Sequence, residues 1–153
     1  MKTLITRKRS PANPEEKERL TVLHLVAEDR ERARQQLPLA DGRTLVLQLP
    51  RGTVLLPQDV LCTEEGVAVA IVAAEPEPVY TLRAADSFAL LRAAYHLGNR
   101  HVAMELAPDY LRIKPDPVLA HLLEQLSGVD YVEEIAPFVP DSGAYRTNVH
   151  PHG

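Results

Sequence analysis

The sequence has 153 residues, of which 45% are hydrophobic and 25% are charged, and its formal net charge is −4. These values are typical of a globular chain that can bury a hydrophobic core, and they exclude wholesale disorder and collagen-like or coiled-coil designs. No run approaches the roughly 18 apolar residues of a membrane span, and residues 1–9 lack the apolar segment of a secretory signal. We therefore expect a cytoplasmic protein, and the single cysteine, Cys62, agrees because it leaves no internal disulfide.

The two halves of the chain differ in charge. Residues 1–75 carry 11 basic and 11 acidic side chains, whereas residues 76–153 carry 6 basic and 10 acidic ones. Neither half has the net positive charge of a dedicated nucleic-acid-binding protein.

The first half has the pattern of short strands separated by turns. Its apolar runs are brief and rich in β-branched residues, and they lie at 21–26, 44–49, 54–56 and 67–72. This pattern predicts a small all-β domain over residues 1–74. The charged segment 28–36 has no apolar stripe to bury, so we expect an extended edge or a loop there. The Glu-Pro-Glu-Pro run at 75–78 predicts a stiff linker.

The second half alternates between strand and helix patterns. Strands are expected at 79–82, 101–107, 110–114 and 131–139, and helices at 86–97 and 117–126. Asp86 and Asp116 are the expected helix N-caps, Gly98 is expected to end the first helix, and His101 to open the next strand. The order βαββαβ is that of a ferredoxin-like domain over residues 75–139. The predicted fold class is therefore α+β, with residues 140–153 as a flexible tail that contains histidine.

Histidine is the residue type that points to chemistry in this chain. Two of the six histidines, His96 and His101, flank the end of the first predicted helix, and two more, His150 and His152, lie in the tail. Imidazole is a good ligand for nickel, copper and zinc. The spacing alone does not place these residues on one metal ion, and no protease, hydrolase or nucleotide-binding motif is present.

The run Ala-Tyr-His-Leu-Gly-Asn-Arg-His at 94–101 resembles the signature of the UreE family of urease accessory proteins, the nickel metallochaperones. Residues 42–52 resemble the N-terminal β domain of that family, which itself resembles a peptide-binding module. The helix that begins at Asp116 and the Gly-Ala-Tyr at 143–145 resemble the end of the family pattern, so the likeness covers essentially the whole chain.

The resemblance implies a homodimer that binds Ni²⁺ and has no catalytic activity of its own. In the family pattern His101 faces its own copy across the two-fold axis, so that one histidine per chain supplies two ligands. His150 and His152 are available to complete the ligand set, and His96 is a further candidate. The implied partners are the urease accessory GTPase (UreG) and the urease apoprotein complex, with no nucleic acid or membrane. Zn²⁺ or Cu²⁺ is expected to substitute for nickel in vitro.

Two features depart from the family pattern. Many relatives end in a long histidine-rich tail, whereas two histidines stand in the tail here, which argues against bulk nickel storage. Residues 114–117 read Lys-Pro-Asp-Pro where some relatives carry an additional H-x-H site.

Three other functions compete with nickel delivery. A general divalent-metal-binding or protein-docking module without a urease role fits the same residues. An RNA-binding sheet would need aromatic residues on its central strands, and residues 102–106 offer none. A hydrolase using His101 with Asp109 or Glu105 would lack an accompanying nucleophile motif.

Overall fold

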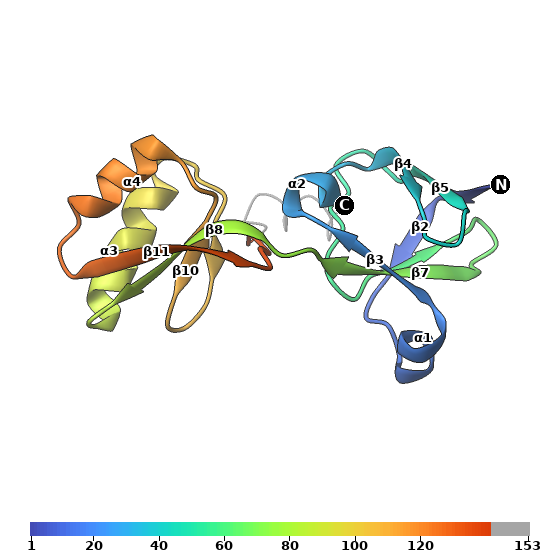
Figure 1. The fold of residues 1–153 in the computed structure, drawn as a ribbon, viewed down its shortest axis with the longest axis horizontal. Helices are drawn as coiled ribbons and strands as arrows, with labels where there is room; N and C mark the ends of the chain where they lie inside the picture. The colour runs from blue at the N-terminus through green and yellow to red at the C-terminus, as the bar shows by residue number, and fades with distance from the viewer. Residues whose placement is uncertain (142–153) are drawn as a thin grey trace, which may run out of the picture. The chain divides into compact units, whose positions relative to one another are not determined.

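The computed structural model describes residues 1–141 and divides into two compact units, Met1–Glu75 and a second unit that begins at Pro76. Figure 1 shows the elements of both units. None of the helices in the described residues has the length and apolarity needed to cross a bilayer.

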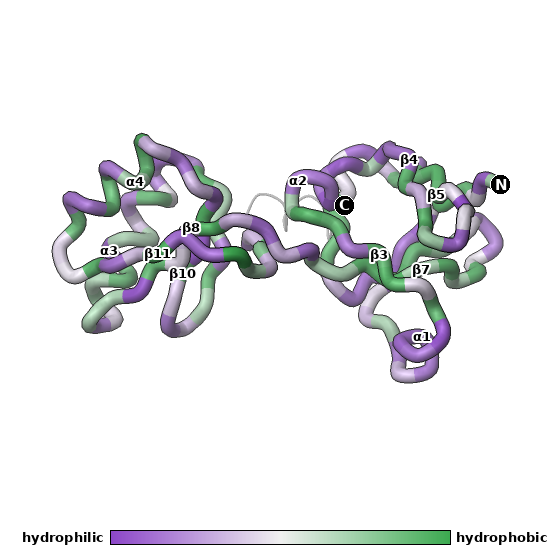
Figure 2. The backbone as a smooth tube through the Cα atoms, in the orientation of Figure 1, coloured by the Kyte–Doolittle hydropathy of each residue, from purple (hydrophilic) through white to green (hydrophobic). Residues whose placement is uncertain are grey.

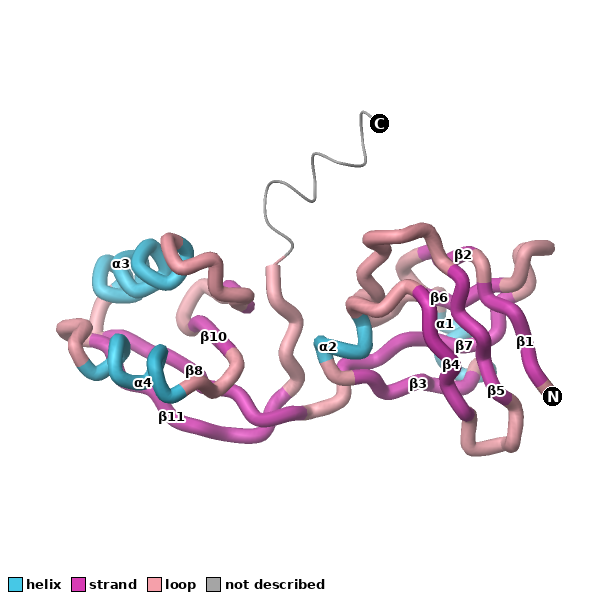
Figure 3. Tube along the Cα trace, turned by 90° about the horizontal axis from the view of Figure 1, so that it is seen from above, coloured by secondary structure: helices cyan, strands magenta, loops and turns pink. Residues whose placement is uncertain are grey.

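The first unit consists of two small sheets with two short helices (Figure 3). Its elements are β1 (Lys2–Ile5), β2 (Arg7–Arg9), α1 (Pro14–Arg19), β3 (Thr21–Leu25), α2 (Ala27–Arg30), β4 (Arg34–Pro38), β5 (Thr44–Gln48), β6 (Val60–Cys62) and β7 (Ala68–Ala74). One sheet has the order β1-β5-β4 and the other the order β2-β6-β7-β3. The first half of the chain is therefore rich in strands, as predicted.

Alternation of apolar and polar residues places the core between the two sheets. On β5 the side chains of Leu45 and Leu47 are buried, and they share a cluster with Leu23 and Leu25 of β3. The interior strand β7 is buried over four consecutive residues, 69–72, which Figure 2 shows as a green segment. A strand covered on both faces is expected to read as a continuous apolar run.

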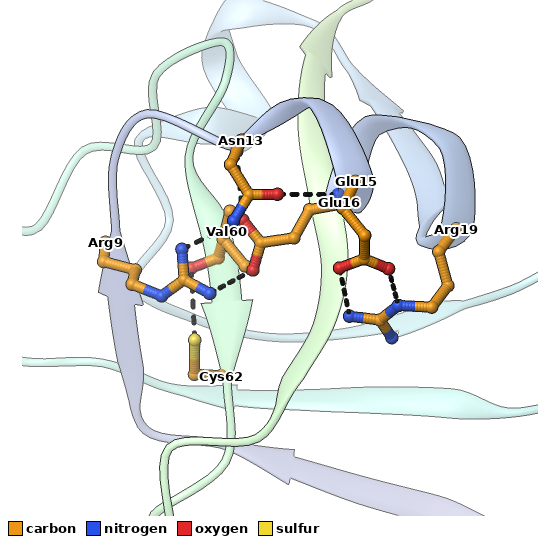
Figure 4. A network of polar contacts seen from close by, with 7 residues as sticks. All are labelled: Arg9, Asn13, Glu15, Glu16, Arg19, Val60 and Cys62. Atoms are coloured by element: carbon orange, nitrogen blue, oxygen red, sulfur yellow. Dashed lines mark hydrogen bonds and ion pairs between the residues drawn. The ribbon is translucent and has the colours of Figure 1, made fainter.

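The sequence-based prediction of this unit missed its two helices. The segment 28–36 is not wholly extended, because Ala27–Arg30 forms α2 before β4 begins at Arg34. Helix α1 has a capping box, in which the Asn13 side chain accepts from the Glu16 amide (2.8 Å) and the Glu16 carboxylate accepts from the Asn13 amide (3.1 Å) (Figure 4).

One predicted strand is absent, and another begins earlier than expected. Residues 54–56 form no strand, although Leu55 is fully buried and its amide donates to the carbonyl of Arg30 (2.8 Å). Its burial explains the apolar run without a strand. Strand β8 starts at Glu77, inside the segment predicted to be a linker.

The second unit has the predicted ferredoxin-like order. Its elements are β8 (Glu77–Ala84), α3 (Ser87–Gly98), β9 (Glu105–Leu106), β10 (Leu111–Ile113), α4 (Pro117–Glu124) and β11 (Val129–Ala136). The strands form one antiparallel sheet in the order β11-β8-β10-β9. The predicted α+β fold class is confirmed, with a strand-rich unit followed by a βαββαβ unit.

The helices α3 and α4 pack against the sheet through a small number of apolar side chains. Leu90 and Leu97 of α3 and Leu123 of α4 lie in one cluster with Tyr80 and Leu82 of β8. Both helices therefore cover the same face of the sheet, the face on which alternate residues of β8 are apolar. Within the described part of this unit, the opposite side of α3 packs against no other element.

Both predicted N-caps are confirmed. The Asp86 side chain accepts a hydrogen bond from the Ala89 amide (2.8 Å), and that of Asp116 accepts from the amides of Val118 (2.8 Å) and Leu119 (3.1 Å). Helix α4 ends at Glu124, before the predicted 126, and Gly128 follows with a positive φ of 77°.

Candidate metal centre

The end of α3 differs from the prediction and gives His101 an unusual backbone conformation. Gly98 does not end the helix in a left-handed conformation, because it is itself the last residue of α3. The left-handed residue is His101, with φ of 58°. Strand β9 begins only at Glu105, so the prediction that His101 opens a strand is wrong.

Two hydrogen bonds define the turn around His101. Its amide donates to the carbonyl of Gly98 (3.0 Å), and the amide of Val102 donates to the carbonyl of Leu97 (3.3 Å). This pair of bonds is a Schellman motif, in which the left-handed position is usually glycine. Val102 and Leu97 also lie in the same apolar cluster, the hydrophobic contact that accompanies this motif. Histidine therefore occupies a position at which the backbone conformation favours glycine.

The His101 turn leaves its imidazole accessible. His101 is exposed, as are Asn99 and Arg100 before it. A non-glycine residue at positive φ is held there by its surroundings, and such residues concentrate at functional sites. The exposed ring can therefore reach an ion outside the unit.

His96 lies at the same end of α3 but in a different setting. It is half-buried in the last turn of the helix, and its ring meets the ring of Tyr95 edge-on at 5.5 Å between centroids. A histidine in the last helical turn also interacts favourably with the negative end of the helix dipole. The structure thus brings His96 and His101 to one helix end without joining them in a ligand cluster.

The described residues of one chain do not contain a complete metal site. Among residues 1–141 no group of three or more His, Cys, Asp or Glu side chains is placed to hold an ion. The predicted ligands His150 and His152 lie outside the described residues. The last described residue, Asp141, donates its amide hydrogen to the carbonyl of Met104 (2.8 Å), three residues after His101.

An apolar stripe runs along the outer side of α3, on the helix that precedes the His101 turn. Phe88, Leu91 and Tyr95 recur at helical spacing, and their exposed fractions are 66%, 66% and 67%. The guanidinium of Arg92 lies over the Phe88 ring at 5.9 Å. The spacing of these residues is visible in the sequence, but only the packing of α3 shows that the stripe faces away from the core.

Within residues 1–141, the remaining histidines and the cysteine belong to no group that could hold a metal ion. His24 is exposed on β3, an edge strand, and lies 3.9 Å from a carboxylate oxygen of Glu75. His121 is exposed on α4 and contacts Gln125 at 3.1 Å. Cys62 is 3% exposed within the first unit.

The most strongly shifted carboxyl group is structural. Hydrogen bonds from the Arg9 guanidinium, and then from the Asn13 amide, lower the pKa of Glu16 to about 2. The Glu16 side chain is thus committed to Arg9 and to the cap of α1 (Figure 4).

Neither carboxylate considered for a hydrolase forms a pair with His101. Glu105 accepts hydrogen bonds from the Val139 amide (2.8 Å) and from the Tyr110 hydroxyl (3.1 Å). Asp109 is exposed between β9 and β10.

Comparison with known proteins identifies relatives over nearly the whole chain. Residues 1–74 match the model of the UreE urease accessory protein N-terminal domain, and residues 77–153 match that of the C-terminal domain. A urease accessory protein UreE of Microcystis aeruginosa is 52% identical over 124 residues, which cover 81% of this chain and 77% of the relative. The UreE of a Nostoc species is 48% identical, covering 85% of this chain and 87% of the relative. That of Thermosynechococcus vestitus is 44% identical, covering 88% and 93%.

Proposed function

Since the chain belongs to the UreE family of urease accessory proteins, which are not enzymes, we propose that it is a nickel-binding metallochaperone. In this role it carries Ni²⁺ as cargo to the urease apoprotein complex during urease maturation. The urease accessory GTPase (UreG) is the proposed partner, and the cytoplasm the proposed compartment.

The observation that carries this proposal is the left-handed, exposed His101. A histidine at a backbone position suited to glycine lowers the stability of the fold. The same placement leaves an imidazole accessible at the surface. An exposed imidazole is a suitable ligand for nickel, and also for zinc or copper in vitro. The proposed metal-binding residue is therefore His101.

One imidazole is too few to hold a nickel ion, and a homodimer supplies the second. In a two-fold dimer a residue near the axis lies close to its symmetry mate. The exposed stripe of Phe88, Leu91 and Tyr95 on the same helix is an apolar surface that a second copy can cover. We propose that the two His101 side chains meet at such an axis.

The tail histidines, His150 and His152, complete the proposed ligand set, and His96 is a further candidate at the same helix end. A partly open site suits a carrier, because the ion must be held and then released to a partner. Because ligation requires neutral imidazole, we expect nickel affinity to fall as the pH drops through roughly 6.5.

Nickel titration calorimetry with light scattering in the same buffer tests the proposal. The informative variant is His101→Asn, because asparagine tolerates the left-handed conformation while removing the imidazole. We expect this variant to stay dimeric and to lose the tightest nickel site. His121→Ala, which removes an exposed histidine from α4, is the matched control and should bind nickel as the wild type does. Unchanged nickel stoichiometry and affinity in His101→Asn would refute the proposal.

A further inference from the structure

Strand β11 forms a long open edge of the sheet in the second unit. It has eight residues, Val129–Ala136, and stands at one end of the strand order β11-β8-β10-β9. Figure 3 shows it at the margin of the sheet, with β8 on one side. The opposite edge strand, β9, has two residues, and the edge strands of the first unit have three to five each. In the described part of the chain, β11 is therefore the longest strand at the edge of a sheet.

Backbone groups of every second residue of β11 point to this open edge. The Ala85 amide donates to the carbonyl of Gly128 (3.2 Å), and from there the register with β8 runs without a bulge to the end of β11. Hydrogen-bonded and non-hydrogen-bonded pairs alternate along an antiparallel ladder. The residues whose amides and carbonyls point outward are therefore Val129, Tyr131, Glu133 and Ile135. Within residues 1–141, these outward groups have no hydrogen-bond partner.

An open strand edge is a template on which another strand can pair. Strand β11 lacks the proline, lysine or bulge that often protects an edge, and it carries three carboxylates and no basic residue. In the two antiparallel registers that overlap two copies of β11 most, Asp130 lies opposite Glu134, or Glu133 lies opposite its own copy. Like charges directly opposite each other destabilise a strand pair. The edge is therefore unsuited to a second copy of itself and suited to a basic strand.

The face of the sheet that no helix covers gives this edge a side-chain pattern. Tyr131 packs in the cluster under the helices, so its neighbours Asp130 and Val132, and Glu134 two residues further on, lie on the other face. Val132 is 54% exposed. Asp130 is exposed and forms no ion pair with any of residues 1–141, because Arg83, opposite it on β8, lies over a tyrosine ring instead. The pattern along the edge is acidic, apolar, acidic.

We propose that the outer edge of β11 binds an extended basic segment of another protein, which adds to the sheet as a fifth strand. Backbone hydrogen bonds supply the attraction in this mode of recognition, and alternate side chains supply the specificity. Opposite charges directly across a strand pair stabilise it. The segment that fits has two Lys or Arg residues four positions apart, opposite Asp130 and Glu134, with an apolar residue midway, opposite Val132. The edge belongs to a different element from the His101 turn, and its use does not depend on nickel.

The test is a fluorescence anisotropy titration of the full-length chain with a labelled peptide, Thr-Val-Lys-Lys-Val-Thr-Lys-Val. In antiparallel pairing its three lysines lie opposite Glu134, Glu133 and Asp130. One control peptide has glutamate in place of each lysine, and another is methylated on the alternate amide nitrogens that would face β11. We expect only the unmethylated lysine peptide to bind, with an affinity that falls as salt is added.

Two pairs of variants separate backbone pairing from charge. Glu133→Thr and Glu133→Pro both remove an exposed carboxylate, but only proline removes an outward amide, at a position where an edge strand tolerates it. We expect proline to weaken peptide binding about threefold or more relative to threonine. Asp130→Lys should weaken binding about threefold or more, whereas Asp109→Lys, with the same net charge and an exposed site between β9 and β10, should bind as the wild type does. If melting curves show that the proline variant is unfolded, Asp130→Lys and the methylated peptide decide the question.

Amide hydrogen exchange locates the bound peptide. The peptide should slow exchange of the outward Tyr131 and Glu133 amides and leave the Val132 amide, which faces β8, as protected as before. Absence of binding, equal binding of either control peptide, or unchanged exchange at the edge would overturn the proposal. A lower light-scattering mass of Glu133→Pro without peptide would show that a second copy covers β11, which would also overturn it. None of these results bears on the nickel titration of His101→Asn, so the carrier function is tested separately.

Discussion

Replacing His101 by glycine should stabilise the protein relative to replacing it by alanine. At a φ of 58°, any residue with a Cβ crowds the neighbouring carbonyl, which costs about 1–2 kcal/mol. Glycine removes this cost but gives the unfolded chain more conformational freedom, which lowers the free energy of unfolding by about 0.4–1 kcal/mol. The net advantage of glycine over alanine is therefore about 0.5–1 kcal/mol, and because His101 is exposed, little buried side-chain contact is lost in either variant.

Differential scanning calorimetry of the two variants measures this difference. For a domain of this size, about 0.5–1 kcal/mol corresponds to a Tm about 2–8 °C higher for His101→Gly than for His101→Ala. Gly98→Ala is the matched control, because Gly98 lies in α3 and an added Cβ would meet nothing within 4 Å beyond its chain neighbours and the helix backbone, so alanine should stabilise there. If the alanine variant at 101 melts at or above the glycine variant, the left-handed assignment of His101 is wrong.

Three further predictions concern stability and assembly. Glu16→Gln should lower the Tm at neutral pH. Because the native pKa of Glu16 is lowered to about 2, the difference from wild type should be complete above the ordinary glutamate pKa of about 4.5 and should disappear as the pH falls through about 2, which thermal melts across this range check. Asp116→Ala should cost about 1 kcal/mol in chemical denaturation, since it removes the N-cap of α4, and a value near zero would show that this cap is dispensable. Leu91→Glu places a charge in the exposed stripe of α3, so it should shift the mass measured by light scattering from that of the proposed dimer toward that of the monomer. An unaltered mass would argue against this face as the dimer contact.

The parts of the fold that were predictable from sequence depend on local interactions. Asp86 and Asp116 cap their helices through amides two or three residues ahead, so their role can be recognised without knowledge of the rest of the chain. A local signal of the same kind marks the start of α1, where Asn13 and Glu16 form a capping box that was not predicted from the sequence.

The parts that were missed depend on contacts that a linear pattern does not carry. A glycine near a helix end usually marks the left-handed residue, so Gly98 was predicted to take it, yet the packing of Val102 with Leu97 shifts that position to His101. The spacing of Phe88 and Leu91 predicts one helix face, but only the position of α3 on the sheet shows that this face is exposed. The hydrogen bond from the Val139 amide to the Glu105 carboxylate joins residues 34 positions apart and had no sequence signal.

The burial of Cys62 limits which donor atoms this chain can offer to a metal ion. It is the one cysteine in the sequence, it is 3% exposed, and its thiol lies 3.7 Å from the Val60 carbonyl. Soft ions such as Cu(I) prefer thiolate, whereas imidazole suits borderline divalent ions. With its only sulfhydryl enclosed in a strand, the molecule presents no thiolate at its surface, so a soft ion that approaches it meets none of the charged sulfur donors that such ions prefer.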